Sequence, residues 1–142
     1  MRIADVLRTK GAAVVTINPD AMVAELLAGF AERNIGAMVV VGPDGLVGIV
    51  SERDVVRELY KHGPSVLSRP VAKIMMTAVA TCTKSDTVDS ISVLMTNNRV
   101  RHVPVLEGGK LAGIVSIGDV VKTRLEELEA EQKQLQSYIA QG

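Results

Sequence analysis

The stretch LVGIVSERDVV at residues 46–56 returns 65 positions later as LAGIVSIGDVV at residues 111–121. Eight of the eleven aligned positions are identical, and the alignment needs no gap. Self-similarity at a fixed offset is typical of repeated structural units. We therefore interpret the chain as an internal duplication, with repeats expected at 1–62 and 63–124 and a C-terminal helix at 125–142.

The first copy has the hydrophobic periodicity of alternating strands and helices. Residues 14–16 predict a short strand, and Asp20 is the expected N-cap of a helix whose apolar residues recur at helical spacing. The mostly β-branched runs at 37–41 and 46–51 are joined by Gly-Pro-Asp-Gly, which favours a tight hairpin turn. A helix over 54–60 closes the unit, so the predicted order is β-α-β-β-α.

The second copy predicts the same order of elements. Thr81 lies in its expected first strand, and helices are expected from about Asp86 and from Ser116. Upstream of each copy, IADVL at 3–7 resembles VAKIM at 71–75 at an offset of 68. Because one unit alone leaves its sheet face poorly covered, we expect an α+β fold in which the two repeats pack sheet to sheet about a pseudo-twofold axis.

The composition argues against several classes of function. Of 142 residues, 16 are basic and 16 acidic, and only Phe30, Tyr60 and Tyr138 are aromatic, whereas nucleic-acid surfaces normally carry excess positive charge. Nucleic acid is therefore not an expected partner. The longest apolar runs reach about five residues, far below the roughly 20 that a membrane helix needs. The opening MRIADVLRTK has no apolar signal-peptide core, which favours a cytoplasmic location.

Residues suited to catalysis or metal binding are sparse. Cys82 is the only cysteine, which excludes an internal disulfide and a thiolate metal cage, and it is interpreted as a small buried residue. His62 and His102 have no partners at metal-ligand or catalytic-triad spacing, and neither a P-loop nor G-x-G-x-x-G is present. We expect no catalytic residue and no metal site.

Three segments identify a family resemblance. GIVSERD at 48–54 and GIVSIGD at 113–119, together with RHVPV at 101–105, resemble a tandem pair of cystathionine-β-synthase-type (CBS) domains, the Bateman module. The resemblance covers roughly residues 1–124. It implies a regulatory module that binds adenine nucleotides in clefts between the two repeats. It also implies a homodimer, because such modules usually pair into a flat disc of four repeats.

Each duplicated segment contains an S-x-x-D motif, Ser51 with Asp54 and Ser116 with Asp119, where a strand gives way to a helix. Backbone N–H groups at a helix start lack intrahelical partners and favour a polar or anionic guest. A carboxylate three residues on is suited to accepting hydrogen bonds from the two hydroxyls of a ribose. The alternative is a capping box, in which Ser and Asp satisfy the helix's own amides. The two roles can coexist.

A cationic segment, Arg101 and His102, precedes Val103 and Pro104 at the expected start of a strand. One interpretation is a solvated strand edge whose charges discourage edge pairing. The family resemblance instead implies that this segment points at nucleotide phosphates. It further implies that each site joins the S-x-x-D segment of one repeat to the first strand and the strand start of the other.

The resemblance thus implies two unequal sites. Site one comprises Ser51, Arg53, Asp54, Thr81, Arg101, His102 and Pro104. Site two comprises Thr16, Gly36, Ala37, Met38, Ser116, Gly118 and Asp119. Gly118 leaves room for close approach of a ligand. Because site two has no counterparts of Arg101 and His102, we expect charged phosphates to prefer site one.

The tail beyond the repeats extends the last helix. Leu125, Leu128, Leu135 and Ile139 occupy a and d positions of a heptad, with Gln132 at an intervening a position. This spacing favours a helix–helix contact between two chains. The alternative is a helix whose leucine stripe folds back on its own domain.

The favoured function is a dimeric sensor that binds AMP, ADP, ATP or NAD(H) as a regulatory ligand and signals to an unidentified partner protein. Ligand occupancy can act as a signal only when the ligand binds one conformation better than another. The alternative is an interaction module that keeps the fold and the dimer but binds no nucleotide.

Overall fold

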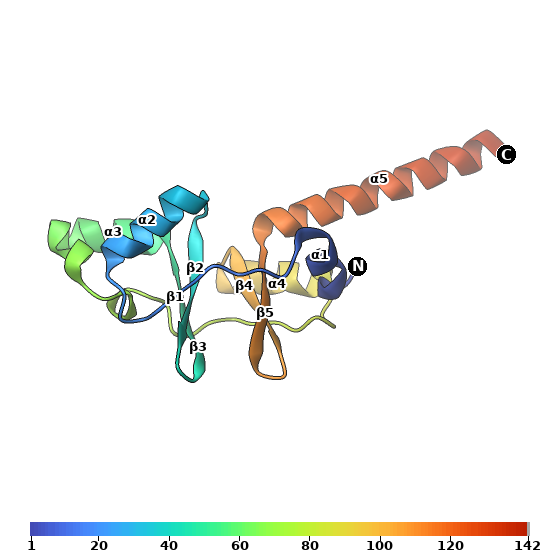
Figure 1. Ribbon diagram of the computed structural model, residues 1–142. Coiled ribbons are helices and arrows are strands. Elements are labelled where there is room, and N and C mark those ends of the chain that lie inside the picture. The colour runs from blue at the N-terminus through green and yellow to red at the C-terminus, as the bar shows by residue number, and fades with distance from the viewer. Residues whose placement is uncertain (142) are drawn as a thin grey trace.

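The computed structural model describes residues 1–141 and shows two similar halves side by side (Figure 1). The first half contains β1 (Thr16–Ile17), α2 (Val23–Arg33), β2 (Ala37–Gly42), β3 (Gly45–Ser51) and α3 (Glu52–His62). The second contains α4 (Val88–Asn98), β4 (His102–Glu107), β5 (Lys110–Ser116) and α5 (Ile117–Gln141). A helix α1 (Ile3–Lys10) precedes the first half, and two 3-10 turns, Gly63–Ser68 and Val71–Lys73, connect the halves.

The two β-hairpins confirm the duplication, because they share the same pairing and the same shift of register. Strand β1 pairs in parallel with β2, which forms an antiparallel hairpin with β3, and β4 forms the matching hairpin with β5. The first hairpin shifts register between Val40 and Val41, and the second between Val105 and Leu106. Both irregularities lie at the same place in the repeat. The α+β pair of repeats predicted from the sequence is what the structure contains.

The first strand of the second repeat was predicted wrongly. Thr81 lies outside any strand, and only Cys82 reaches β4, forming a single parallel bridge with Val105. The amide of Cys82 donates to the carbonyl of Pro104 (3.0 Å), and Leu106 donates back to Cys82 (2.8 Å). The second sheet therefore has two strands where the first has three. The Cys82 side chain is buried, as expected.

The predicted helix starts also need correction. Asp20 is not an N-cap, because α2 begins at Val23 after Met22, and the Asp20 amide donates to the side-chain oxygen of Asn18 (2.8 Å). Such a side-chain turn is a typical use of Asn in loops. In the second repeat the cap is Thr87, whose hydroxyl accepts a hydrogen bond from the Ser90 amide (3.1 Å).

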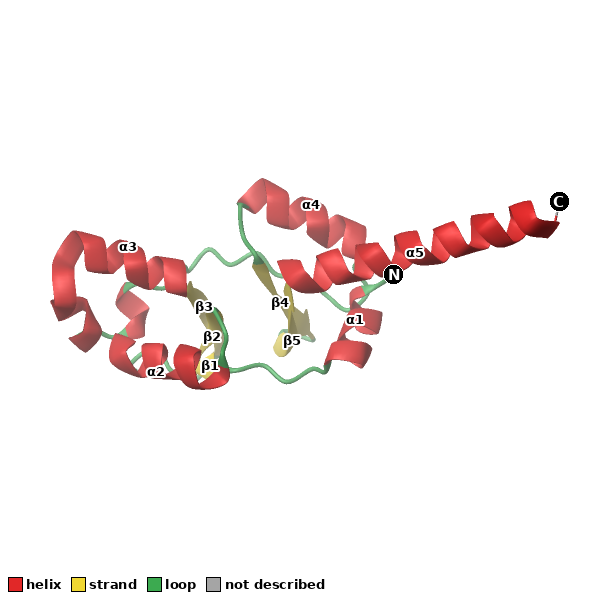
Figure 2. Cartoon of the chain, turned by 90° about the horizontal axis from the view of Figure 1, so that it is seen from above, coloured by secondary structure: helices red, strands yellow, loops and turns green. Residues whose placement is uncertain are grey.

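The two hydrophobic cores do not follow the order of the chain. Ile3, Val6 and Leu7 of α1 are buried in the core around β4 and β5. The segment after α3 packs back into the core around β2 and β3, through Val66, Val71 and Ile74. Seen from above, α1 accordingly lies beside the start of α5 rather than beside α2 (Figure 2). Each buried aliphatic side chain contributes about 1.5 to 3 kcal/mol, so α1 is anchored to the second half.

Two glycines mark where the segments leading into the repeats cross the strands. A Cβ atom on Gly113 of β5 would lie 2.8 Å from Leu7 of α1. A Cβ atom on Gly48 of β3 would lie 2.7 Å from the sulfur of Met75 and 2.8 Å from the carbonyl oxygen of Met76. Leu7 and Met75 are related by the offset of 68 read from the sequence. The leading segments are therefore duplicated in space as well as in sequence.

Helix α5 runs without a break through residue 141 and leaves the body of the protein beyond its first turns (Figure 1). Leu125, Leu128, Leu135 and Ile139 are between 54% and 68% exposed. The alternative in which this stripe folds back on its own domain is therefore not observed. The predicted tail ends at Gly142, which lies outside the described residues. Among residues 1–141, no helix is both long and apolar enough to span a bilayer.

Candidate functional site

Both S-x-x-D motifs lie at the same end of the two hairpins, next to the starts of β2 and β4 (Figure 1). Ala37 is the register partner of Ser51, and His102 is the partner of Ser116. The first amide of each following helix donates to a strand-start carbonyl: Glu52 to Gly36 (3.0 Å) and Ile117 to Arg101 (2.8 Å). The motif and the strand start of one repeat therefore form one connected unit.

The capping box is present in both copies. The Ser51 amide and hydroxyl both donate to Oδ2 of Asp54, at 2.9 and 3.0 Å, while the Asp54 amide donates to the Ser51 hydroxyl oxygen at 3.4 Å. Ser116 and Asp119 repeat these contacts at 2.8, 3.0 and 3.2 Å. These bonds satisfy amides that the first helical turn leaves without partners, and each cap is worth about 1 kcal/mol. In both copies the two bonds that Ser donates end on Oδ2 of the Asp.

The two carboxylates differ in the cation beside them. In the first repeat, the guanidinium of Arg57 lies 3.7 Å from Oδ1 of Asp54, within the same helix. In the second, Oδ2 of Asp119 accepts a further hydrogen bond, from the ammonium of Lys10 at 2.6 Å. Lys10 is the last residue of α1 and lies 109 positions away in the sequence.

Lys10 and the capping bonds change the acidity of Asp119. Burial alone raises the pKa of this carboxyl, but the hydrogen bonds from Lys10 and Ser116 outweigh it, so the pKa lies below its usual value of 3.8. The Asp119 side chain is 20% exposed and that of Lys10 is 30% exposed. The pair is thus partly shielded from water, and Asp119 is charged at neutral pH.

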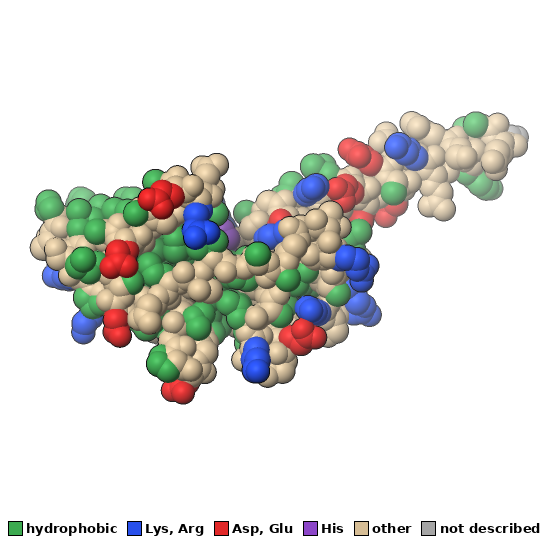
Figure 3. Space-filling view, viewed as in Figure 1, with side chains coloured by type: hydrophobic (Ala, Val, Ile, Leu, Met, Phe, Trp, Pro, Cys, Tyr) green, Lys and Arg blue, Asp and Glu red, His purple; other side chains and the backbone are tan. Residues whose placement is uncertain are grey.

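His102 lies near this pair at the start of β4. Burial, together with the nearby charges of Lys10 and Arg101, lowers the pKa of His102 below 6.5, while Asp119 acts in the opposite direction. The imidazole is therefore neutral at pH 7. In the space-filling view, the face toward the reader is notched between the two halves, where basic side chains and a histidine gather (Figure 3).

The predicted residues group mainly within their own repeats. Contacts unite Ser51, Asp54, Gly36 and Ala37 in the first repeat and Ser116, Asp119, Arg101 and His102 in the second. Met38 and Pro104 are buried one and two positions into β2 and β4. Thr16, Thr81, Arg53 and Gly118 are exposed.

The predicted pairing of segments across the two repeats stays a prediction. Among residues 1–141, no hydrogen bond or ion pair joins Asp54 to Arg101 or His102. The structure does contain a close approach between the sheets, because β3 and β5 contact each other. The ends of these strands carry the two motifs.

Sequence reasoning missed Lys10. The offset of 68 that relates the leading segments places Lys10 on Ala78, so the duplication gives no reason to expect a charged group there. Its partners, the carbonyl of Ile114 (2.7 Å) and the carboxylate of Asp119, are more than 100 residues away in the chain. Only the packing of α1 on the second half brings them together.

Two largely apolar grooves lie beside the first turns of α3 and α5. A groove between α2 and α3 is lined by Leu27, Phe30, Ala31, Asn34, Ile35, Gly36, Glu52, Val55, Val56 and Leu59. A second lies along α5 and is lined by Ile117, Gly118, Val121, Lys122, Leu125, Glu126 and Glu129. In the described part of the chain, no three His, Cys, Asp or Glu side chains gather in a way that could hold a metal ion.

The known proteins that resemble this chain in sequence or in fold contain CBS domains. A CBS domain-containing protein of Arabidopsis thaliana, described as mitochondrial CBSX3, is 36% identical over 149 residues, covering 99% of this chain and 72% of the relative. The crystal structure of a CBS-domain containing protein from Agrobacterium tumefaciens has a TM-score of 0.84 and 43% identity, covering 87% of this chain and 92% of the other. The CBS domain pair of protein MJ0100, in complex with 5′-methylthioadenosine and S-adenosyl-L-methionine, shares the fold, with a TM-score of 0.79 at 21% identity over 89% and 98% of the two chains.

The family model described as CBS domain matches this chain twice, over residues 3–61 and 71–126. The two matches cover the two halves of the fold, and each includes one S-x-x-D motif. The chain belongs to the CBS-domain family and carries two CBS domains in tandem.

Proposed function

We propose that this CBS pair is a regulatory module that binds an adenine nucleotide, AMP, ADP, ATP or NAD(H), and has no catalytic activity of its own. The observation that carries the proposal is the free oxygen of Asp54. Its Oδ2 holds the Ser51 amide and hydroxyl, whereas Oδ1 accepts no hydrogen bond within residues 1–141. Capping therefore leaves one carboxylate oxygen to accept a hydrogen bond from a ribose hydroxyl.

The ligand of a solved structural neighbour supports the same class of molecule. That a CBS pair of the same fold holds 5′-methylthioadenosine and S-adenosyl-L-methionine supports an adenosyl ligand for this fold.

Site one of the proposal joins the Asp54 segment to Thr81, Arg101 and His102 of the other repeat. Arg101 is exposed and permanently charged, and His102 is half-buried. A phosphate that binds there favours the protonated imidazole, and each charge-assisted contact is typically worth about 1.5 to 3 kcal/mol. The phosphate end of the ligand is therefore assigned to Arg101, and the ribose to Asp54.

Calorimetric titration of AMP, ATP and NADH into the protein tests this function. We expect binding of at least one of them, and a loss of about tenfold or more in affinity in Asp54→Asn. Asn keeps an oxygen that can accept the capping bonds but removes the charge. Asp44→Asn, in the turn of the β2–β3 hairpin, is the matched control and should bind like the wild type. No heat with any of the three at millimolar concentration defeats the proposal.

We also propose a homodimer. Val56 on α3 and Val121 on α5 occupy equivalent positions in the two repeats and are 65% and 51% exposed. Tyr60 and Leu125, one turn further along, are 91% and 55% exposed. Two equivalent exposed apolar helix faces suit a symmetric partner, because an isologous interface uses the same patch on both chains. Sedimentation velocity should show a dimer that Val56→Lys weakens, and a monomer at high micromolar concentration refutes it.

The alternative, a dimerisation module without a ligand, is favoured by the capping boxes, which account for both S-x-x-D motifs without a nucleotide. A dimer that gives no heat with any nucleotide is its expected signature. The cytoplasmic location favoured in the sequence analysis belongs with these proposals, since the Arabidopsis relative is described as mitochondrial. Fractionation of cells that produce the protein tests it.

A further inference from the structure

The exposed side of α5 forms one apolar seam. Val120 and Thr123 are buried and mark the side of the helix that packs on the second half. The residues at successive a and d heptad positions lie on another side, and we call them the α5 seam: Val121, Leu125, Leu128, Gln132, Leu135 and Ile139. The aliphatic side chains of the seam are between 51% and 68% exposed, so the fold of one chain leaves them uncovered.

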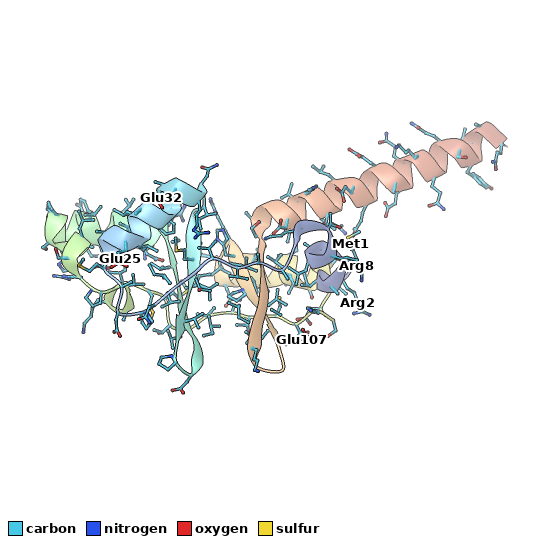
Figure 4. All side chains as sticks on the ribbon, viewed as in Figure 1. Met1, Arg2, Arg8, Glu25, Glu32 and Glu107 are labelled. Atoms are coloured by element: carbon cyan, nitrogen blue, oxygen red, sulfur yellow. The ribbon has the colours of Figure 1, made fainter. Side chains whose placement is uncertain are left out.

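The tail that carries the seam leaves the body in a fixed direction. Arg124 donates a hydrogen bond to Asp89 of α4 at 2.8 Å. The ammonium of Met1 lies 3.5 Å from Oε1 of Glu127, where α5 leaves the body (Figure 4). The tail then extends past the second half and away from the first in both views (Figure 1, Figure 2). The first half of the same chain is therefore out of reach of the seam.

We propose that the α5 seam packs against the α5 seam of a second copy in a parallel, in-register coiled coil. This inference rests on the proposed homodimer and adds its orientation, with the second repeat of one chain beside the second repeat of the other. Two modules that lie side by side in opposite orientations would send their tails away from each other. The parallel arrangement covers the exposed helix faces of the modules and the two seams together, about one twofold axis.

The polar residue in the seam favours the parallel arrangement. In a parallel coiled coil an a position faces the same a position of the second copy, so the two Gln132 amides meet and can hydrogen bond. In an antiparallel pair an a position faces a d position, and Gln132 would lie against a leucine. Its amide would then be buried without a partner, which costs more than the bond itself contributes. One polar a position thereby sets both direction and register.

The charges beside the seam agree with this arrangement. In a parallel coil a g residue lies beside the e residue five positions later in the other chain, which places Arg124 beside Glu129 of the second copy. The bonds that Arg124 makes within residues 1–141 use Nη1, so Nη2 remains for this contact. In the antiparallel pair that buries the whole seam, Glu131 would instead face Glu131 of the second copy. Like charges at such positions oppose pairing.

The seam acts together with the modules because it is short. Residues 121–139 span about 28 Å of helix, which is little for a coiled coil of free peptides. Contact between the modules holds the two tails close and raises their effective concentration. We therefore expect Leu135→Lys to weaken the dimer about tenfold or more in sedimentation velocity. Ser137→Lys, at an f position on the outside of the coil, is the matched control and should leave the dimer unchanged.

A cysteine at the end of the tail tests the direction of the pairing in the full-length protein. Ile139→Cys places two thiols opposite each other in a parallel coil, so mild oxidation should give a covalent dimer on non-reducing electrophoresis. Ser137→Cys places its thiols on opposite outer faces, and it should cross-link at least about tenfold more slowly. The native Cys82 is buried, so the wild type should give no cross-link on the same timescale.

The outcomes separate the inference from the proposed homodimer. If the protein is a dimer but Ile139→Cys cross-links no faster than Ser137→Cys, the coiled coil is refuted and the homodimer stands. If Val121→Cys links to Ile139→Cys in a mixture while neither links to itself, the pair is antiparallel and the inference is wrong. If the wild type is a monomer at high micromolar concentration, the homodimer fails and takes the inference with it, whereas nucleotide binding is judged by calorimetry alone.

Discussion

Replacing Asp54 by Ala removes a residue that the structure places in two roles. Oδ2 accepts two hydrogen bonds from Ser51, and the side chain is only 14% exposed. Loss of the cap leaves the Ser51 amide without its partner, which costs about 1 to 2 kcal/mol of unfolding free energy. For a chain of this size that lowers Tm by about 2 to 8 °C.

Asp54→Asn separates the two roles. The amide oxygen can still accept the capping bonds, so we expect a loss of about 0.5 kcal/mol or less, whereas nucleotide binding should weaken as much as in Asp54→Ala. Asp119→Ala should be more destabilising than Asp54→Ala, because it also leaves Lys10 without its carboxylate. Urea unfolding followed by circular dichroism, with each variant at the same protein concentration, measures the differences. Wild-type stability in Asp54→Ala would refute the capping geometry.

Three further predictions concern packing and ionisation. Gly48→Ala should lower the free energy of unfolding by about 1 to 3 kcal/mol, because the new Cβ would lie 2.8 Å from the Met76 carbonyl oxygen. Gly42→Ala is the control, because its Cβ would have its nearest neighbour at 3.5 Å. Equal urea midpoints for the two variants would contradict this prediction. Cys82 is 4% exposed, and burial raises the pKa of its thiol to about 11. A disulfide reagent at pH 8 should therefore react with Cys82 only as fast as the protein opens. Rapid labelling of the native state would contradict this prediction. The folded-state pKa of His102 lies below the unfolded value of 6.5, so the unfolded chain binds the proton first and the stability of the fold should fall as pH drops below about 6.5. His102→Gln should remove that part of the fall. A pKa of His102 above 6.5, measured by NMR, would contradict this prediction.

The duplicated segments made the hairpins and the helices after them predictable. Runs of mostly β-branched residues on either side of a Gly-Pro-Asp-Gly turn define β2 and β3 locally, and the repeat predicts β4 and β5 in the same way. The capping box was also readable, since it needs only a Ser and an Asp three residues apart at a helix start.

Features that depend on long-range packing were not predictable. The pattern around Thr81 suits a strand, but a strand exists only where a partner is in reach, and only Cys82 meets β4. Asp20 has the right residue type for a cap, yet Asn18 takes its amide and α2 begins later. The contact of Lys10 with Asp119 follows from the packing of α1 on the second half, which no local pattern encodes.

The most direct test of the account is a crystal structure of the protein grown with AMP. We expect the ribose hydroxyls within hydrogen-bond distance of the Asp54 carboxylate, with the phosphate toward Arg101. Density for AMP at Asp119 with Asp54 unoccupied, or an Asp54 that contacts Ser51 alone in crystals saturated with AMP, contradicts it.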